Sequence, residues 1–478
     1  MSRTLRAERK YAIVVGGSMA GLLAARVLSD HFEQVSLIER DALPARVEQR
    51  RGVPQGRHTH GLLASGGNVL EKLFPGISQG LVKAGAVSGD IARDSRWFFE
   101  GACLARAASG LSGLLMTRPL LEAAVRERVL ASPKVVRRDE TAVKELVFDR
   151  EAGRVSGLRA GGQTLSADLV VDATGRGSRS PQWLERFGFE KPVEDVVQVA
   201  LGYTTRFFQR QPADLNGDPV VVIPPTPQGK RGGVMLAQEG NRWTVTLIAY
   251  FGNYAPEDLS GFIAFASTLP APYIHEVVSR NEPLGEAVSA RFPASVRRRY
   301  ELLQRFPEGY LVFGDAICSF NPIYGQGMSV AALQALELEN TLASVDGDFA
   351  LAKAFFRRAA KIVDIPWSIA VGNDLRIPET VGRRTAGVNF INWYLSKLHK
   401  AAHTDPVPAL AFHRVGNLLA PPQSIMHPRI AARVLLRNLL SARKSAQPGA
   451  VETTVAAEPN SQMSSAPGPS HRGIENLP

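Results

Sequence analysis

The first forty residues contain two short apolar runs separated by a glycine turn and an amphipathic segment. The run at residues 10–15 is followed by Gly16. Arg26, Asp30 and Glu33 then occur at helical spacing, and a second run covers residues 35–38. This pattern predicts a strand, a tight turn, a helix and a strand, the opening of a doubly wound parallel sheet. The polar residues within it argue against a secretory signal, although the chain starts with basic residues.

Two later segments extend this unit. Residues 117–130 have a helical pattern, with Thr117 as the expected N-cap and Pro119 in the first turn, where its missing N–H costs little. Residues 167–179 read as a buried strand that runs into a glycine turn. We therefore assign residues 10–190 to the first part of an α/β nucleotide-binding domain.

The pattern changes between residues 196 and 251, where apolar and polar positions alternate between Pro and Gly turns. This alternation predicts antiparallel sheet, and we assign residues 191–300 to a mainly β domain inserted into the first one. A strand before Gly314 and a helix over about 328–342 predict that residues 301–345 complete the nucleotide-binding domain. Residues 346–442 read as mainly helical, and residues 443–478 lack the apolar side chains of a core, which predicts disorder.

Composition narrows the class of protein. The chain has 478 residues, 45% of them hydrophobic, and a formal net charge of +11, but no nucleic-acid-reading module, so we expect no nucleic-acid partner. Its two cysteines, Cys103 and Cys318, form no disulfide framework and no metal-ligand spacing, which favours a reducing cytoplasm and no bound metal. No apolar stretch approaches the roughly 18 residues of a membrane-spanning helix.

The first glycine turn is close to a dinucleotide-binding fingerprint. Gly16 would make the sharp turn and Gly21 would let the helix lie against the strand, while Ser18 replaces the usual second glycine with another small residue. Glu39 follows Gly21 by 18 residues, at the end of the second strand, where a carboxylate can accept hydrogen bonds from ribose hydroxyls. The turn by itself could also precede any helix, so it does not identify the nucleotide.

A second glycine turn lies about 300 residues further on, in "GDAICSFNPIYGQGMSV". Asp315 follows a strand and can hold a polyol hydroxyl, and the chain passes Pro322, Gly325 and Gly327 into a helix whose first amides suit an anionic ring. An ordinary strand, turn and helix would look similar. The pairing of the two distant turns is what favours a shared cofactor.

Three segments together carry a family resemblance: "GGSMAG" with Glu39, "VVDATGRGSR" and "GDAICSFNPIYGQGMS". They resemble the FAD-dependent monooxygenases of the para-hydroxybenzoate hydroxylase type. The loop "RRGVPQGRHTHGLL", with "PQWL" and "NPIYGQGMS", is further similar to the flavin-dependent epoxidases of bacterial polyether biosynthesis, the monensin and lasalocid type. The resemblance spans residues 10 to about 375. It implies a Rossmann-like FAD-binding domain of the glutathione-reductase type, an inserted antiparallel-sheet substrate domain and a helical C-terminal region.

The resemblance also implies roles for individual residues. Gly16, Ser18 and Gly21 would hold the FAD pyrophosphate, Glu39 the ribose and Asp315 the ribityl or pyrophosphate oxygens, and Arg118 would approach the FAD. Pro322 opens the segment along the flavin, and Gly325, Gln326, Gly327 and Met328 would face its pyrimidine edge. Arg57, His58 and His60, on a loop that approaches the cofactor, are candidate catalytic residues, although both histidines could equally be hydrogen-bonding struts. Cys318 is expected in the core rather than as a flavin attachment.

We therefore expect an FAD-dependent monooxygenase of secondary metabolism that transfers one oxygen atom from O2 through a flavin hydroperoxide to a lipophilic substrate. The inserted sheet would supply the substrate wall, with Tyr203, Phe207, Phe208, Trp243, Tyr250 and Phe251 as candidates, each of which could also be core. Epoxidation is favoured over aromatic hydroxylation because no residue stands out as the base that a phenol requires. Asp172 is followed by Ala173 and Thr174 with Gly175 displaced from the family pattern, so NADH, NADPH and a separate flavin reductase all stay open as the electron source.

Three rival functions share some of these features. A flavin halogenase usually carries W-x-W-x-I-P, which is absent, and a prenyl-chain reductase has the same fold without oxygen chemistry. The third is a peripheral membrane flavoprotein, because residues 427–444 form a basic amphipathic helix that could pack on its own domain or make weak contact with a membrane surface.

Overall fold

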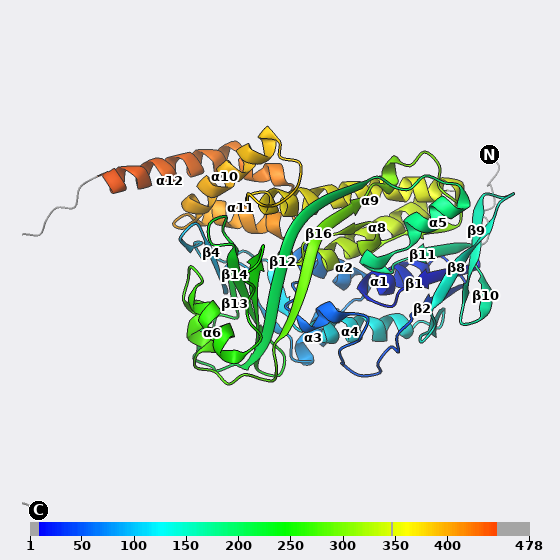
Figure 1. Cartoon of the computed structure of the whole chain (residues 1–478), viewed down its shortest axis with the longest axis horizontal. Helices are drawn as coiled ribbons and strands as arrows, with labels where there is room; N and C mark the ends of the chain where they lie inside the picture. The colour runs from blue at the N-terminus through cyan, green and yellow to red at the C-terminus, as the bar shows by residue number, and fades with distance from the viewer. Residues whose placement is uncertain (1–8, 346–347, 447–478) are drawn as a thin grey trace, which may run out of the picture. The chain divides into compact units, whose positions relative to one another are not determined.

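The computed structural model describes residues 9–345 and 348–446. The described chain up to Asn438 forms one compact unit, and the chain from Leu439 onward is a separate one. Figure 1 shows the elements of the first unit in chain order. Within the described ranges, no helix is both long and apolar enough to cross a membrane.

A five-stranded parallel sheet forms the centre of the predicted nucleotide-binding domain. Its strands are β1 (Tyr11–Val15), β2 (Gln34–Ile38), β7 (Val135–Arg138), β11 (Leu169–Asp172) and β17 (Tyr310–Val312), in the order β17-β11-β1-β2-β7. Central strands such as β11 are buried at every position, as expected for strands with helices on both faces. The mixed α/β architecture agrees with the fold class predicted from the sequence.

The helices that pack with this sheet come from distant parts of the chain. They are α1 (Met19–Leu28), α2 (Ala64–Leu73), α3 (Ile77–Lys83), α4 (Arg118–Leu130), α5 (Ser180–Phe187) and α8 (Gly327–Ser344). Thr117 caps α4 by accepting a hydrogen bond from the Leu120 amide, as its position in the sequence predicts. A smaller antiparallel sheet adds β8 (Val143–Asp149), β9 (Arg154–Ala160) and β10 (Gln163–Ser166), and β3 (Val87–Asp90) pairs with β6 (Ser112–Leu115).

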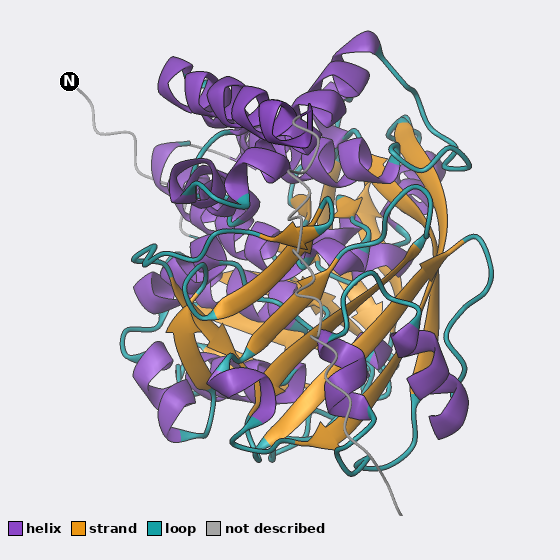
Figure 2. Cartoon of the chain, turned by 90° about the vertical axis from the view of Figure 1, so that its left-hand side faces the viewer, coloured by secondary structure: helices purple, strands orange, loops and turns teal. Residues whose placement is uncertain are grey.

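An eight-stranded sheet contains the predicted inserted strands and also strands from outside residues 191–300. It comprises β4 (Ser95–Phe99), β5 (Ala102–Cys103), β12 (Glu194–Gln209), β13 (Val220–Ile223), β14 (Arg231–Gln238), β15 (Arg242–Tyr250), β16 (Val288–Arg298) and β18 (Cys318–Ser319). Figure 2 shows these strands side by side. Most neighbours are antiparallel as predicted, but β13 pairs with β4 in parallel. The domain boundaries drawn from the sequence stay a prediction.

One face of this sheet packs on α6 (Leu259–Ser267) and α7 (Tyr273–Val278), and Phe208 and Trp243 are fully buried in that core. The C-terminal region contains α9 (Asp348–Asp374), α10 (Ala386–Ala402), α11 (Pro406–Gly416) and α12 (Pro428–Ala446), in agreement with the helical region predicted there. Helix α12 ends four residues beyond residue 442, so residues 443–446 of the predicted disordered tail are helical. The rest of that tail, residues 447–478, lies outside the described residues.

Candidate active site

Three glycine turns that are far apart in the sequence meet at the carboxyl edge of the parallel sheet. Gly16 has a φ of +107°, and a methyl group on it would lie 2.6 Å from the carbonyl oxygen of Ala173. A methyl group on Gly21 would lie only 1.7 Å from the carbonyl oxygen of Gly16, and one on Gly314 would lie 2.7 Å from the Cβ of Ala20. Because the strands before these turns are parallel neighbours, their ends form one site.

Asp315 lies where the turn after β11, which contains Gly175, meets the turn after β17, which contains Gly314. Its Cβ would be 3.9 Å from a methyl group on Gly175, and its Oδ1 would be 3.5 Å from one on Gly327. Burial raises the pKa of Asp315 to about 6, while Arg118 and Arg176 act in the opposite direction. Asp315 lines the cavity described below and has no hydrogen bond at its carboxylate within the described residues, so it can accept one from a ligand hydroxyl.

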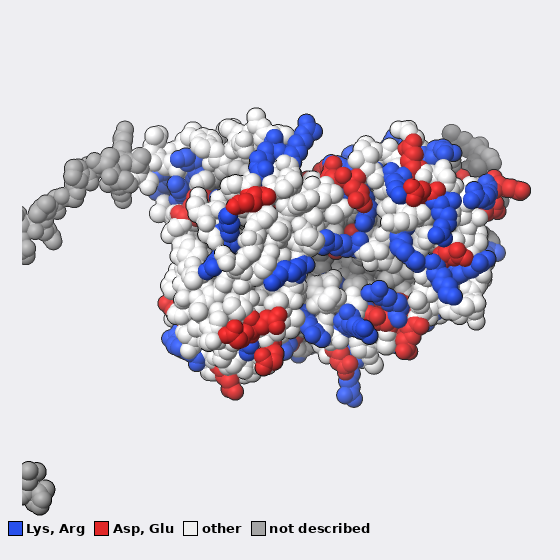
Figure 3. Space-filling model, in the orientation of Figure 1, with Lys and Arg blue, Asp and Glu red and all other residues white. Residues whose placement is uncertain are grey.

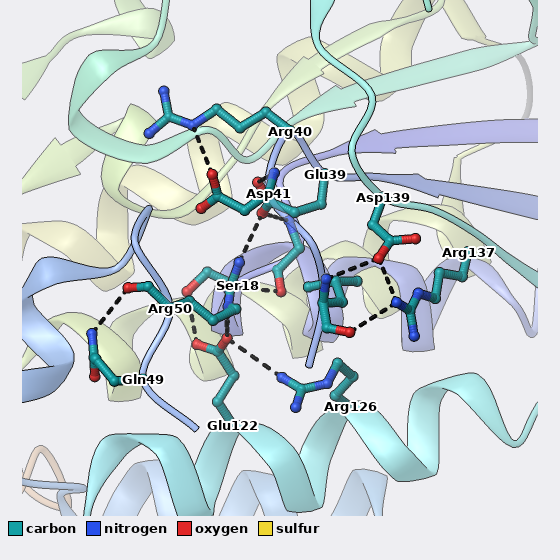
Figure 4. A network of polar contacts seen from close by, with 12 residues as sticks. Ser18, Glu39, Arg40, Asp41, Gln49, Arg50, Glu122, Arg126, Arg137 and Asp139 are labelled. Carbon is teal, nitrogen blue, oxygen red and sulfur yellow. Dashed lines mark hydrogen bonds and ion pairs between the residues drawn. The ribbon is translucent and has the colours of Figure 1, made fainter. Parts of the chain in front are cut away.

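The N-terminus of α1 is surrounded by buried charged side chains, shown in Figure 4. The Ser18 hydroxyl donates to Glu122 at 3.1 Å and accepts from Arg118 at 2.9 Å. Glu122 also pairs with Arg50 at 2.6 Å and with Arg126 at 3.7 Å, and these arginines and Arg118 are all buried. Three guanidinium groups around one carboxylate leave an excess of positive charge at a helix N-terminus, which favours an anionic ligand.

Glu39 lies at the end of β2, beside this cluster. Its Oε2 accepts a hydrogen bond of 2.8 Å from the Gly17 amide and lies 3.3 Å from the Arg50 guanidinium. The side chain is buried and lines the cavity. Glu39 is therefore in the position required for the predicted ribose contact, and that contact stays a prediction.

The segment from Pro322 to Met328 runs along the cavity and enters α8 at Gly327. Gly325 has a φ of +64°, and the buried Oε1 of Gln326 accepts no hydrogen bond within the described chain. Pro322, Gly325, Gln326, Gly327 and Met328 all line the cavity. A buried amide oxygen without a donor is costly unless a ligand supplies one, which is consistent with the predicted flavin position.

Asp374, at the end of α9, accepts hydrogen bonds from residues in and next to this segment. Its Oδ1 accepts hydrogen bonds from Tyr250 at 2.9 Å, Asn321 at 2.8 Å and Tyr324 at 2.8 Å. Burial raises the pKa of Asp374 to about 6. The inserted sheet, the glycine segment and the C-terminal helices are thus joined by one carboxylate.

The three candidate catalytic residues also border the cavity. Burial lowers the pKa of His58 to about 4, with Arg57 adding to the shift, and burial lowers that of His60 to about 3. His58 Nδ1 lies 2.9 Å from the Thr205 hydroxyl, and His60 Nδ1–H donates to the carbonyl oxygen of His58 at 3.0 Å. Both imidazoles are neutral near pH 7, so they are suited to hydrogen bonding and are weak bases. Arg57 is exposed at the rim.

A single cavity of about 2110 Å³ joins the glycine turns to the C-terminal helices. Ligand pockets typically measure about 300–1,000 Å³, so this one has room for a large cofactor and a second molecule. Part of the cavity is lined by apolar and aromatic side chains, and we call this part the apolar lobe. Its residues are Trp97, Phe99, Val220, Val222, Leu236, Ile248, Leu395 and Phe412. Of the six aromatic residues predicted for the substrate wall, Tyr203 and Tyr250 line the cavity, whereas Phe207, Phe208, Trp243 and Phe251 do not.

The site fits FAD on three observations of its own residues. The glycines allow a ligand to approach the backbone, and the arginines offer positive charge for a pyrophosphate. Asp315 and Gln326 present side-chain oxygens that accept no hydrogen bond from the part of the chain that the structure describes. Cys318 is buried in β18 and does not border the cavity, as expected for a core residue. Within the described residues, no group of three or more His, Cys, Asp or Glu side chains is arranged to hold a metal ion.

Comparison with known proteins identifies the family. Residues 10–350 match the family described as FAD binding domain. The chain is also 34% identical over 459 residues to Protein Rv3254 of Mycobacterium tuberculosis (strain ATCC 25618 / H37Rv), covering 90% of this chain and 94% of that protein. The chain therefore belongs to this FAD-binding family, within the superfamily of flavin monooxygenases that resemble para-hydroxybenzoate hydroxylase. It is an oxidoreductase of that class, and FAD is its cofactor.

Solved structures share the fold at low sequence identity. PqsL from Pseudomonas aeruginosa, a probable FAD-dependent monooxygenase, has a TM-score of 0.58 and 16% identity, covering 80% of this chain and 99% of its own. The flavin-dependent brominase Bmp2 has a TM-score of 0.59 and 14% identity, covering 92% and 100%. The oxygenase of 2-methyl-3-hydroxypyridine-5-carboxylic acid has a TM-score of 0.57 and 21% identity, covering 86% and 98%. These likenesses show the fold and do not select among its reactions.

Sequence reasoning missed several residues of this site. Arg50 belongs to the loop quoted for the resemblance, and Glu122 follows Arg118 by one helical turn, so both carried a signal that was not used. Asp374 and His399 carried no signal in the sequence, because each is an ordinary polar residue in a helical pattern. His399 lies between Phe99 and Phe412, with ring centroids at 4.4 and 4.8 Å, and neither ring nitrogen has a hydrogen-bond partner within the described chain.

Proposed function

We propose that this protein transfers one oxygen atom from O2 to a lipophilic substrate, and that the reaction is the epoxidation of an alkene in secondary metabolism. The observation that carries the proposal is the single cavity that joins the predicted FAD contacts to the apolar lobe. Bound and reduced FAD would supply the activation of O2. The chain's own residues would hold the cofactor, exclude water and place the substrate.

The chemistry of the cavity residues supports an alkene over a phenol. A phenol must lose a proton to react, and His58 and His60, with pKa values lowered to about 4 and 3, are poor bases for it. The pKa values of Tyr250 and Tyr324 are raised, mainly by burial, so these hydroxyls stay protonated. An alkene needs no ionisation, and an apolar wall suits it.

The proposed reaction balances with a nicotinamide donor. One atom of O2 forms both new C–O bonds of the epoxide, the other leaves as water, and two electrons come from NADH or NADPH with one further proton. The donor would reduce the flavin either directly or through a separate flavin reductase, and the two routes are to be compared by experiment.

The test is an incubation of the purified FAD-loaded enzyme under 18O2, with a panel of lipophilic olefins and phenols and with NADH or NADPH. We expect a product heavier by one 18O atom, which mass spectrometry and product characterisation identify as an epoxide. The control is the same incubation under 16O2 in H218O, where no label should enter before the epoxide opens. Label from water would contradict the oxygenase proposal.

The other outcomes separate the rival functions. A labelled phenol would replace epoxidation by aromatic hydroxylation. A halogenated product in the presence of chloride or bromide would indicate a halogenase, and a saturated product formed without O2 would indicate a prenyl-chain reductase. If no olefin or phenol of the panel stimulates NAD(P)H oxidation, the result would favour the non-enzymatic alternative, a peripheral membrane flavoprotein.

A further inference from the structure

Exposed apolar side chains are concentrated on the C-terminal helices. Of the 18 large apolar side chains that are exposed in the described residues, nine lie between Val381 and Leu436, a stretch of 56 residues. Single exposed apolar residues are normal on a protein surface, but a concentration of them marks a binding surface. We define the C-terminal apolar surface as Phe390, Ile391, Trp393, Met426, Leu435 and Leu436.

The fold does not need these side chains for its core. Phe390 and Trp393, on α10, are 50% and 52% exposed, and their rings lie 5.8 Å apart. Other residues of α10 make its internal contacts: Leu398 belongs to the same buried apolar cluster as Val434 of α12, and the Lys397 carbonyl accepts a hydrogen bond from Asn438 at 2.9 Å. The exposed aromatic pair is therefore available to an outside partner.

The charge of the same region restricts that partner. Residues 375–438 contain nine Lys and Arg and two acidic residues, Glu379 and Asp405, which gives a net charge of +7. Both acids are already engaged, because Asp405 is buried beside Arg433 at 2.9 Å and Glu379 pairs with Lys230. In the view of Figure 3, the upper left part of the molecule, where these helices lie, is mostly uncharged, with Lys and Arg and a few Asp and Glu among the uncharged side chains.

The cavity reaches this surface, and its lining is also exposed elsewhere, as at Arg57. Ile391 and Met426 both belong to the exposed apolar side chains and both line the cavity that contains the apolar lobe. Leu395 and His399 follow Ile391 on the next turns of α10 and continue the lining, and His399 is buried. Val388 and Asn392, close to Ile391 on the same helix, also line the cavity. One side of α10 thus borders the cavity, and Phe390 and Trp393 stand beside its mouth.

We propose that the C-terminal apolar surface docks on an anionic lipid bilayer, with the mouth of the cavity facing the lipid so that a lipophilic substrate enters directly from it. Interfacial aromatic and aliphatic side chains combined with Lys and Arg are the features that bind a helix to an anionic membrane surface. A second copy of the chain fits less well, because two surfaces of net charge +7 repel each other. The docking itself does not depend on the proposed function. Only the proposed route of the substrate rests on that function.

The first experiment is flotation of the full-length FAD-loaded protein with vesicles of phosphatidylcholine, with or without phosphatidylglycerol. We expect binding to the anionic vesicles that weakens as salt is added. Phe390→Ser with Trp393→Ser, and separately Lys400→Glu with Arg429→Glu, should each reduce the bound fraction at least about tenfold. The matched control is Val193→Ser with Leu302→Ser, two apolar residues outside the C-terminal helices that are more exposed than Phe390 and Trp393, and it should bind as the wild type does.

The second experiment tests the mouth of the cavity. A polarity-sensitive fluorophore on Met426→Cys, in a Cys103→Ser background, should shift to the blue on addition of anionic vesicles, whereas the same label on Leu302→Cys should not. Flavin absorbance reports in each sample that the protein is folded and loaded, so these readouts do not depend on oxygen transfer. Equal flotation of the Phe390/Trp393 variant and the wild type, or equal shifts at the two labels, would overturn the proposal. Conversion of a dimer to a monomer by that variant, without lipid binding, would assign the surface to a second copy instead.

Discussion

Among the glycines of the site, Gly21 has the least space for an added side chain. A single methyl group there would lie 1.7 Å from the backbone oxygen of Gly16, and neither backbone can move without separating α1 from β1. We expect Gly21→Ala to weaken FAD binding at least about tenfold, because overpacking costs about 1–3 kcal/mol and displaces the first turn. Fluorescence titration of the apoprotein with FAD measures the change.

Gly67 provides the matched control for this prediction. It lies within α2, and a methyl group on it would contact nothing within 4 Å. Gly67→Ala should leave FAD affinity unchanged and raise the unfolding free energy by up to about 1 kcal/mol, since Ala favours helix over Gly. Equal FAD affinity of the two variants would show that close packing at Gly21 is not what forms the turn.

Asp315 tests the cofactor site from the third turn. Its carboxylate accepts no hydrogen bond within the described residues, so we expect it to accept one from FAD. Asp315→Ala should weaken FAD binding by about 1–3 kcal/mol, the cost of leaving a buried ligand hydroxyl without its partner. Isothermal titration measures it, with the exposed Glu151→Ala as control. An unchanged dissociation constant would remove Asp315 from the predicted contacts.

At the scale of an element, α4 presents Arg118, Glu122 and Arg126 at successive turns, facing the N-terminus of α1. In the absence of FAD, Glu122 is the carboxylate that all three buried arginines share. Glu122→Gln should therefore lower the unfolding free energy of the apoprotein by about 3 kcal/mol, as expected when a buried ion pair loses one partner. The same change should tighten FAD binding, because the pyrophosphate would then compensate the arginines.

Urea unfolding with and without FAD measures both effects. Glu127, exposed on the same helix, supplies the control Glu127→Gln, which should alter neither quantity. A Glu122→Gln apoprotein as stable as the wild type, or one that binds FAD more weakly, would contradict this account of α4.

Local patterns predicted four of the five parallel strands and three of the helices that accompany them. The strand, turn and helix at β1 and α1, the cap of α4 and the glycine entry to α8 were all readable, because each is determined by neighbours within a few residues. The eight-stranded sheet was readable only in part. The pairing of β4 with β13 joins residues about 125 positions apart, and no local pattern encodes which strand edge a distant strand will reach.

At the scale of the whole molecule, buried histidines should make stability depend on pH. Burial lowers the pKa of His58 and His413 to about 4 and of His60 and His399 to about 3. Below pH 6.5 the unfolded chain binds protons at these imidazoles that the folded chain does not bind until about pH 4 or below. The unfolding free energy should therefore fall as the pH decreases from 6.5 towards 4, by up to about 1.4 kcal/mol per pH unit for each fully shifted group.

Two carboxyl groups act in the opposite direction. Asp315 and Asp374, with pKa values raised to about 6, bind protons in the folded chain at a pH where the unfolded chain has lost them, so they stabilise the fold on acidification. Two such groups offset the four histidines only in part. Urea unfolding of the apoprotein at pH 7, 6 and 5 checks the sign, and a flat profile would contradict it.

His399 allows the histidine contribution to be isolated. Arg376, His403 and His413 add to the lowering of its pKa by burial, and its imidazole makes no hydrogen bond with the described residues that a substitution would break. His399→Leu should be close to neutral at pH 7 and reduce the loss of stability between pH 7 and 5 by about 2 kcal/mol. The exposed His427→Gln is the control and should leave the profile unchanged.

The sequence by itself indicated the family and the cofactor, because three short segments resemble those of FAD-dependent monooxygenases, and a glycine turn keeps its spacing within a few residues of chain. It also predicted four of the five parallel strands and the helices α1, α4 and α8, since apolar periodicity is a local property. Only the tertiary structure decided that Arg50 and Glu122 meet at α1, that Asp374 joins three regions, and that the cavity opens beside Phe390 and Trp393. These features depend on which distant surfaces pack together, and packing is governed by the shape and burial of the whole chain rather than by any one segment.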